Sequence, residues 1–147
     1  VARRYPIEPP LIRDPADAPE KIKARGVAVK KAMLVRLLAR GFGEAARLAG
    51  LPTNSGFSGF SDFNLKMPYS EELNAAARDP GPRHILMCHP GHVDAELATL
   101  DPVVDRRRME YEALMREPDL PQRIWRPSRA PHGHALAWPL APEDAAA

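Results

Sequence analysis

An apolar run that ends in a histidine most constrains what this chain can fold into. The residues from Ile85 to Cys88 are apolar, and the run stops at His89-Pro90-Gly91. A short segment with both faces apolar predicts a strand covered by helices, as in a parallel sheet. Side chains that follow such strands gather at one edge of the sheet, where the chemistry of barrels and open sheets is found. His89 is therefore the first candidate for a functional residue.

Composition restricts the class of protein. The 147-residue chain has a formal net charge of +2 and one cysteine, Cys88. Its weak charge and few aromatics do not favour nucleic-acid binding, and a single cysteine excludes an internal disulfide and a thiolate zinc cluster. No window approaches the roughly 18 apolar residues of a membrane span, so we expect no membrane segment and a cytoplasmic location. The 17 prolines gather near both ends. We expect an ordered domain over 1–120 and a Pro/Ala-rich irregular tail over 121–147.

Helices and strands are predicted to alternate along the chain. Apolar residues recur at helical spacing between residues 20 and 50, which predicts one or two helices ending near Gly50. Ser70 is the expected N-cap of the next helix, and Asp101-Pro102 the expected start of a helix through Met115. With short strands ending at Arg13 and Cys88, the pattern predicts an α/β fold of parallel strands covered by helices.

His89 has two interpretations. At the end of a strand its imidazole could act as a general acid/base or a metal ligand; the alternative is a loop histidine bonded to backbone. His92 and Asp94 follow closely, but their irregular spacing does not define a zinc site, which needs three or four converging ligands. Cys88 is expected to be a small buried residue, because nothing in the sequence supplies a base for it.

A second cluster lies between Asn54 and Phe63. Asn54 and Ser55 offer hydrogen-bonding groups and Phe57 a flat apolar face, a mixture that suits a sugar. The alternative is a glycine-rich loop whose phenylalanines reach the core. Arg13, after the first strand, could bind an anion or a substrate oxygen. The arginines 106–108, with glutamates at 110 and 112, are predicted to form a solvated helix face with intrahelical pairs.

These segments are similar to those of the YdjC-like carbohydrate deacetylases, also called the ChbG/HpnK family. The resemblance runs from about residue 1 to about residue 117, and the His-Pro-Gly segment is its most specific part. The segments that carry it are 27–32, 52–60 (PTNSGFSGF), 87–97 (MCHPGHVDAEL) and 101–111 (DPVVDRRRMEY).

The resemblance implies a metal-dependent hydrolase that removes N-acetyl groups from amino sugars on an irregular (β/α) barrel. It implies a divalent ion, magnesium or zinc, held by an aspartate and two histidines in the N-terminal half of the family pattern. This chain matches only the C-terminal half, so no metal ligand is assigned here. His89 is implied as the catalytic residue, and the substrate-binding residues are Arg13, Asn54, Ser55, Phe57 and His92. Ser55 stands where an aspartate is expected.

Two hypotheses about function follow. In the first, the chain is the C-terminal part of a carbohydrate deacetylase, inactive alone because the metal-ligand half is missing. In the second, it is a non-catalytic remnant that acts as a binding or interaction module. The expected partners are an N-acetylated sugar or oligosaccharide and either a second copy of the chain or a complementing N-terminal half; neither nucleic acid nor a membrane is expected.

Overall fold

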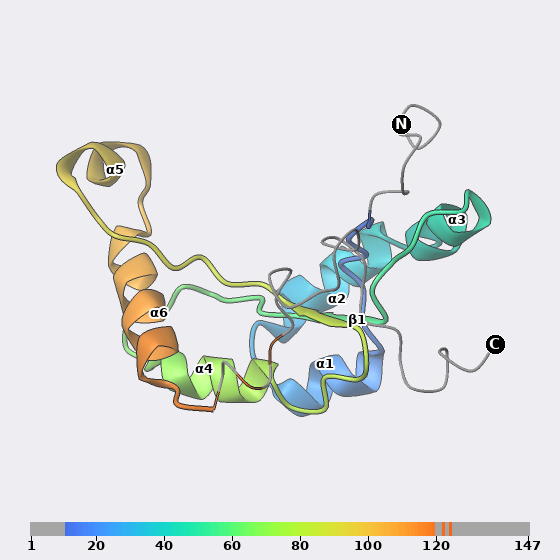
Figure 1. The fold of residues 1–147 in the computed structure, drawn as a ribbon, viewed down its shortest axis with the longest axis horizontal. Coiled ribbons are helices and arrows are strands. Elements are labelled where there is room, and N and C mark those ends of the chain that lie inside the picture. The colour runs from blue at the N-terminus through green and yellow to red at the C-terminus, as the bar shows by residue number, and fades with distance from the viewer. Residues whose placement is uncertain (1–10, 120–121, 123, 125–147) are drawn as a thin grey trace.

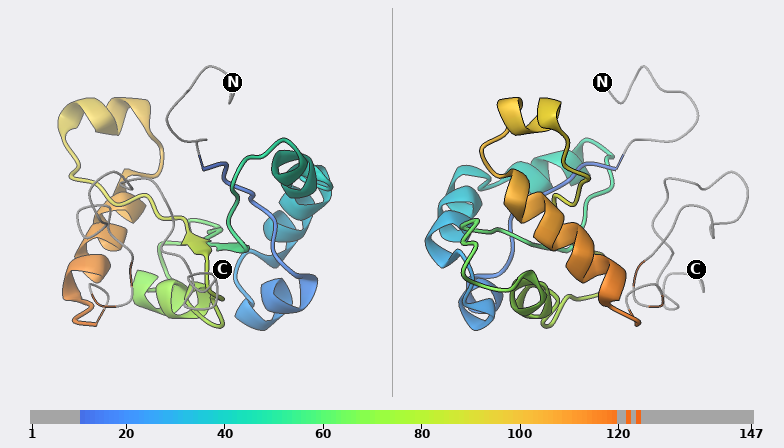
Figure 2. Two further views of the ribbon diagram at one scale, coloured as in Figure 1. Left: turned by 45° about the vertical axis from the view of Figure 1, so that its right-hand side comes forward. Right: turned by 90° about the vertical axis from the view of Figure 1, so that its left-hand side faces the viewer.

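The computed structural model describes residues 11–119, 122 and 124. The elements in chain order are α1 (Pro19–Arg25), α2 (Val29–Leu38), α3 (Phe42–Leu48), β1 (Gly56–Ser58), α4 (Tyr69–Ala76), β2 (His84–Leu86), α5 (Ala95–Leu100) and α6 (Val104–Arg116). In Figure 1, α5 and α6 lie at one end of the longest axis and α3 at the other, with the strands between them; the left view of Figure 2 shows the same order. Apart from residues 122 and 124, the expected tail over 121–147 lies outside the described residues.

The two strands are parallel, as predicted. Gly56 lies opposite His84 and Ser58 opposite Leu86, and the pairing continues where the Met87 N–H donates to the Ser58 carbonyl at 2.9 Å. Upstream, Ile12 forms a parallel bridge with Thr53. The mixed α/β class with parallel strands is therefore confirmed. The carboxyl ends of both strands lie at one edge of the sheet, and the chain leaves β2 there towards His89.

Gly59 allows the close approach of the two strands after β1. Its φ of +93° belongs to the left-handed region, and a Cβ built on it would overlap the Met87 carbonyl oxygen. The segment between Asn54 and Phe63 is not a continuous loop, because β1 forms its centre.

The prediction of one or two helices between residues 20 and 50 is wrong. Three helices occupy the segment, separated by residues with left-handed backbone: Gly26 (φ +73°), Ala28 (φ +45°) and Gly41 (φ +79°). The glycines reach this conformation at little cost. Ala28 is 8% exposed, so tertiary packing holds it in a conformation that helical spacing cannot predict.

The helix starts also differ from expectation. Ser70 is not an N-cap: α4 begins at Tyr69, after Pro68, and no side chain caps it. Asp101 does accept a hydrogen bond from the Val103 N–H at 2.9 Å just before α6. The short helix α5 was not predicted, and Asp94 caps it by accepting the Leu97 N–H at 2.8 Å.

A small apolar core lies between the helices and β1. Its buried side chains come from α1, α2, β1 and α4, and include Ile22, Ala32, Phe57, Leu73 and Ala76. In the described part of the chain, no helix has both the length and the apolar character needed to cross a membrane.

Candidate functional site at the carboxyl end of the strands

His89 lies three residues beyond β2, and its backbone is held by α6 on both sides. Its N–H donates to the Glu110 carboxylate, and its carbonyl accepts from Arg107 Nη1 at 3.3 Å. The imidazole is 31% exposed, with Nδ1 4.0 Å from Glu110 Oε1. That separation is longer than a hydrogen bond but close enough for an electrostatic interaction between the two groups. The structure thus places a partly exposed histidine against a buried carboxylate.

Glu110 belongs to a buried set of charges. Arg106 and Glu110 are each 1% exposed, with Arg106 Nε 3.9 Å from Glu110 Oε1 and Arg106 Nη2 2.6 Å from Glu72 Oε2. Arg106 Nη1 also donates to the Met67 carbonyl at 2.9 Å. The prediction of a solvated face is therefore wrong for Arg106 and Glu110. Packing of α6 on α4 removes both residues from water, and the guanidinium compensates two carboxylates.

The buried charges affect two nearby groups. Burial raises the pKa of the Cys88 thiol, and the Glu110 carboxylate raises it further. Burial, followed by the Glu110 carboxylate, raises the pKa of Tyr69 well above its usual range. Each group is therefore neutral near pH 7. The protonated thiol of Cys88 is a poor nucleophile, and the side chain is half-buried where a buried one was expected.

Phe63 and Lys31 connect α2 to the histidine. The Phe63 ring meets the His89 ring edge-on at 5.8 Å. Lys31 Nζ lies 5.1 Å from the Phe63 centroid and donates to the Ser61 carbonyl at 2.5 Å. The sequence did not predict that Lys31 contacts Phe63 and Ser61, or that Glu110 is buried. For Glu110 a signal exists: positions 103, 106, 110 and 114 share one helical stripe, with Val103 and Leu114 at its ends.

The residues expected to bind substrate are divided between two places. Arg13 is exposed, with its guanidinium 5.7 Å from the centroid of the buried Phe57 ring. His92 is also exposed, with its ring 4.5 Å from that of Tyr111. Ser55 precedes β1, at the amino end of the sheet, and its Oγ accepts the Arg83 N–H at 3.2 Å. It therefore lies at the opposite end of the strands from His89.

The side chain of Asn54 is used by the fold. It is 5% exposed, its Oδ1 accepts the Asp14 N–H at 2.7 Å, and its Nδ2 donates to the Asp14 and Gly56 carbonyls, each at 2.8 Å. Both amide protons are thereby used. Asn54 holds Asp14, the residue after Arg13, against the start of β1. It therefore helps to position Arg13 and does not itself offer its amide to a substrate.

A second polar cluster lies along the strand pair, between Ser58 at the end of β1 and His84 at the start of β2. Ser58 Oγ donates to the Ala76 carbonyl at 2.8 Å, so the 2.7 Å contact with His84 Nε2 requires that nitrogen to be the donor. Burial, followed by the charge of Arg25, lowers the pKa of His84. Arg25 is itself buried and pairs with Asp17 at 2.6 Å. These contacts favour the neutral form of the His84 ring with its proton on Nε2.

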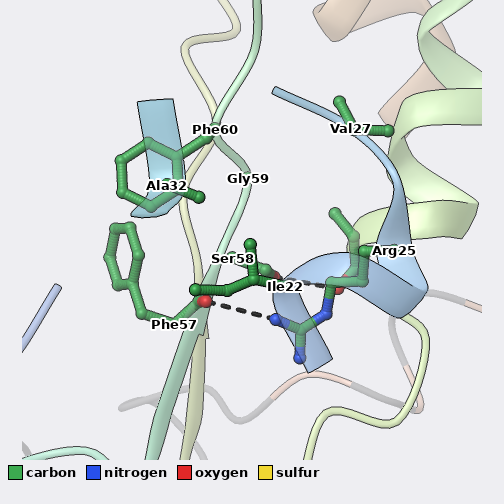
Figure 3. A pocket seen from close by; sticks show the side chains of 9 residues that line it. Ile22, Arg25, Val27, Ala32, Phe57, Ser58, Gly59 and Phe60 are labelled. Carbon is green, nitrogen blue, oxygen red and sulfur yellow. Dashed lines mark hydrogen bonds between the residues drawn. The ribbon is translucent and has the colours of Figure 1, made fainter. Parts of the chain in front are cut away.

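Two cavities lie away from His89. One, behind β1, has a volume of about 20 Å³ and is lined by Ile22, Phe57 and Phe60 among others (Figure 3); it has room for one water. The other is an open groove of about 430 Å³ that includes Asp14, Arg36, Arg40, Arg47 and Ser55. Neither is lined by His89. The groove is large enough for a small ligand, but it lies beside α3 and not at the candidate site.

The described residues contain no group of three or more His, Cys, Asp or Glu side chains that could hold a metal ion. At the candidate site the donors are His89 and Glu110, and the Glu110 carboxylate already faces Arg106 and the His89 N–H. This donor set does not fit the divalent ion that the resemblance implies.

Comparison with known proteins returned no relatives. No family model matches the chain, and neither the curated proteins nor the solved structures include a match.

Proposed function

We propose that this chain contributes the acid/base histidine and part of the sugar-binding surface of a carbohydrate deacetylase of the YdjC-like type. The observation that carries the proposal is the contact between His89 and Glu110. The two residues belong to separate segments that resemble the family, 87–97 and 101–111, and the fold brings them together. A carboxylate behind a histidine orients the ring and stabilises its protonated form.

His89 is suited to act as the general acid. Its Nδ1 is the ring nitrogen near Glu110, so Nε2 is left for a substrate. Nε2 takes a proton from the water that adds to the acetyl carbonyl and gives it to the departing amine of the sugar as the C–N bond breaks, so that acetate and the free amino sugar leave. Glu110 faces the ring while Nε2 handles the proton, and Arg106 lies against Glu110 in its buried position.

The divalent metal ion of such an enzyme is not assigned to the described residues, because their donor set does not fit it. We propose that its ligands come from a complementing half. The parallel bridge of Ile12 with Thr53 and the parallel pair β1 and β2, with helices between successive strands, are consistent with part of an irregular (β/α) barrel. Such a half would supply the remaining strands.

The sugar-binding surface would use the exposed groups. Arg13 offers donors for hydroxyl or carbonyl oxygens and is held over Phe57, while His92 rests on Tyr111. Both lie on segments that lead to or from the strands. An N-acetylated amino sugar or oligosaccharide fits such a surface, because its hydroxyls need polar partners.

The proposal is tested in two steps. Saturation-transfer NMR of the 147-residue protein with N-acetylated chitooligosaccharides should saturate the acetyl methyl group, with a weaker effect in Arg13→Ala. Acetate release is then measured with zinc or magnesium, alone and with the N-terminal half of a YdjC-like deacetylase added in trans. We expect no release from the chain alone, and release in the complemented sample that falls by about 10²-fold or more in His89→Gln.

His92→Gln is the matched control. It should raise KM and leave kcat nearly unchanged, because His92 is expected only to contact substrate. EDTA-sensitive release by the chain alone would show that the chain carries a metal site of its own. Sugar binding without acetate release in the complemented sample would favour the alternative of a non-catalytic binding module, and full turnover by His89→Gln would show that His89 is not the acid.

A further inference from the structure

The open groove beside α3 contains one of the residues expected to bind substrate. Its lining comes from the segment before α1, from α1 and α2, from the turn between α2 and α3, and from α3 itself; Ser55, just before β1, completes it. Its volume of about 430 Å³ falls in the range of small-ligand sites. Ser55 therefore belongs to a cavity of its own, away from His89.

Charges of both signs line this groove. Two of them are already paired within the fold: Asp17 with the buried Arg25 at 2.6 Å, and Lys21 with Asp79 at 3.1 Å. The charges that remain are three guanidinium groups and two carboxylates, from Arg36, Arg40, Arg47, Asp14 and Glu44. Because these charges nearly cancel, the groove attracts neither anions nor cations strongly by net charge.

Two of the arginines are held in place by the fold. Arg36 Nε donates to the Asp17 carbonyl at 3.1 Å, and Arg47 Nη1 donates to Thr53 Oγ1 at 3.3 Å. A guanidinium carries five N–H donors, so each of these side-chain contacts uses one of them. Arg40 is exposed on the turn between α2 and α3. The groove therefore offers guanidinium donors to a ligand.

Asp14 is a firmly placed acceptor in the same groove. Its N–H and its carbonyl both bond to the buried amide of Asn54, at 2.7 and 2.8 Å. Its Oδ1 accepts the Ala16 N–H at 3.0 Å, and a Cβ built on Gly43 would overlap its Oδ2. The absence of a side chain at Gly43 thus lets this carboxylate lie against α3, where Glu44 supplies a second one.

We propose that this groove binds a neutral pyranose sugar. Each hydroxyl of a sugar both accepts and donates a hydrogen bond, so one ring can accept from Arg40 and donate to Glu44 or Asp14. A ligand with one formal charge is repelled by part of the same lining, an anion by the carboxylates and a cation by the guanidinium groups. The site lies apart from His89 and does not depend on the deacetylase proposal.

The test compares sugars that share one ring size and differ in charge. Glucose, galactose and mannose are the neutral probes, glucosamine is the cation, and glucuronate is the anion; glutamine serves as a zwitterion. Each is titrated into the ¹⁵N-labelled 147-residue protein and followed by the shifts of its backbone amides. We expect at least one neutral sugar to shift the amides of Gly41, Gly43 and Ser55, and the charged probes to bind at least about fivefold more weakly. None of the neutral probes has an acetyl group, so the result is independent of deacetylation.

Two double variants locate the binding. Arg40→Gln with Glu44→Gln keeps the size of both side chains and removes their charges, and it should weaken the neutral sugar about tenfold. The matched control is Arg108→Gln with Glu96→Gln, on α6 and α5, which should bind as the parent does. All four side chains are exposed, so circular dichroism should show the parent fold in both variants.

The proposal is overturned if none of the neutral sugars shifts the amides of the groove, or if glucuronate, glucosamine or glutamine binds there more tightly than every neutral sugar. Unchanged affinity in the Arg40 and Glu44 variant would overturn it as well. Shifts confined to the residues around His89 would place the sugar at the candidate site and would count against the groove alone.

Discussion

Arg106 Nη2 lies 2.6 Å from Glu72 Oε2, and these side chains are 1% and 6% exposed. A buried ion pair therefore ties α6, which carries Glu110, to α4. The guanidinium also donates to the Met67 carbonyl and lies 5.0 Å from the Tyr69 ring centroid. The position of Glu110 behind His89 thus depends on a residue that does not touch the histidine.

Replacement of Arg106 by methionine should destabilise the fold strongly. The variant leaves the carboxylates of Glu72 and Glu110 buried without compensation, and we expect a loss of about 3–5 kcal/mol in the free energy of unfolding. Urea denaturation followed by circular dichroism measures it. Arg108→Met, on the exposed side of the same helix, is the control and should change stability little; equal losses would contradict the buried-charge account.

Gly59→Ala should cost more than Gly50→Ala. Both glycines have positive φ, +93° and +74°, but only at Gly59 would a Cβ overlap the backbone of Met87; at Gly50 nothing lies within 4 Å. Gly50→Ala therefore reports backbone strain alone, about 1 kcal/mol, and Gly59→Ala adds the separation of the strands. The urea midpoints of the two variants measure this difference. Equal losses would mean that the strands can move apart at Gly59 without a loss of stability.

The protein should lose stability as pH falls below about 6.5, the ordinary pKa of histidine. Burial lowers the pKa of His84 in the folded state, so the unfolded chain binds a proton first, and stability declines as pH falls from this value towards the folded pKa. His84→Gln keeps a donor for Ser58 Oγ but does not titrate. Its urea midpoint should depend less on pH between 7 and 5 than that of the parent, and an unchanged dependence would contradict this role.

The local sequence pattern was sufficient to predict those elements whose structure depends on neighbouring residues alone. The apolar run before His89 predicts a strand, and the two strands are parallel as expected. The burial of Arg106 was not predictable in this way, because it depends on Glu72, a residue 34 positions earlier that only the packing of α4 against α6 brings close. Likewise, the helix break at Ala28 follows from the packing of a buried residue and not from its own preference.

The position of Asn54 shows the same limit for the candidate site. Its amide in a glycine-rich segment suggests a substrate contact, but both its protons are given to backbone carbonyls. Residue type alone cannot distinguish an amide that faces a ligand from one that fixes the neighbouring chain, because the partners of Asn54 include Asp14, which lies 40 residues away.

The helix α5 has no buried residue, and the aspartates at its two ends, Asp94 and Asp101, bond to neighbouring backbone. Residues 95–100 can therefore be exchanged, lengthened or labelled with little effect on the rest of the fold. A fluorophore attached there would sit on the loop between His89 and Glu110, so it could report on that junction without replacing either residue.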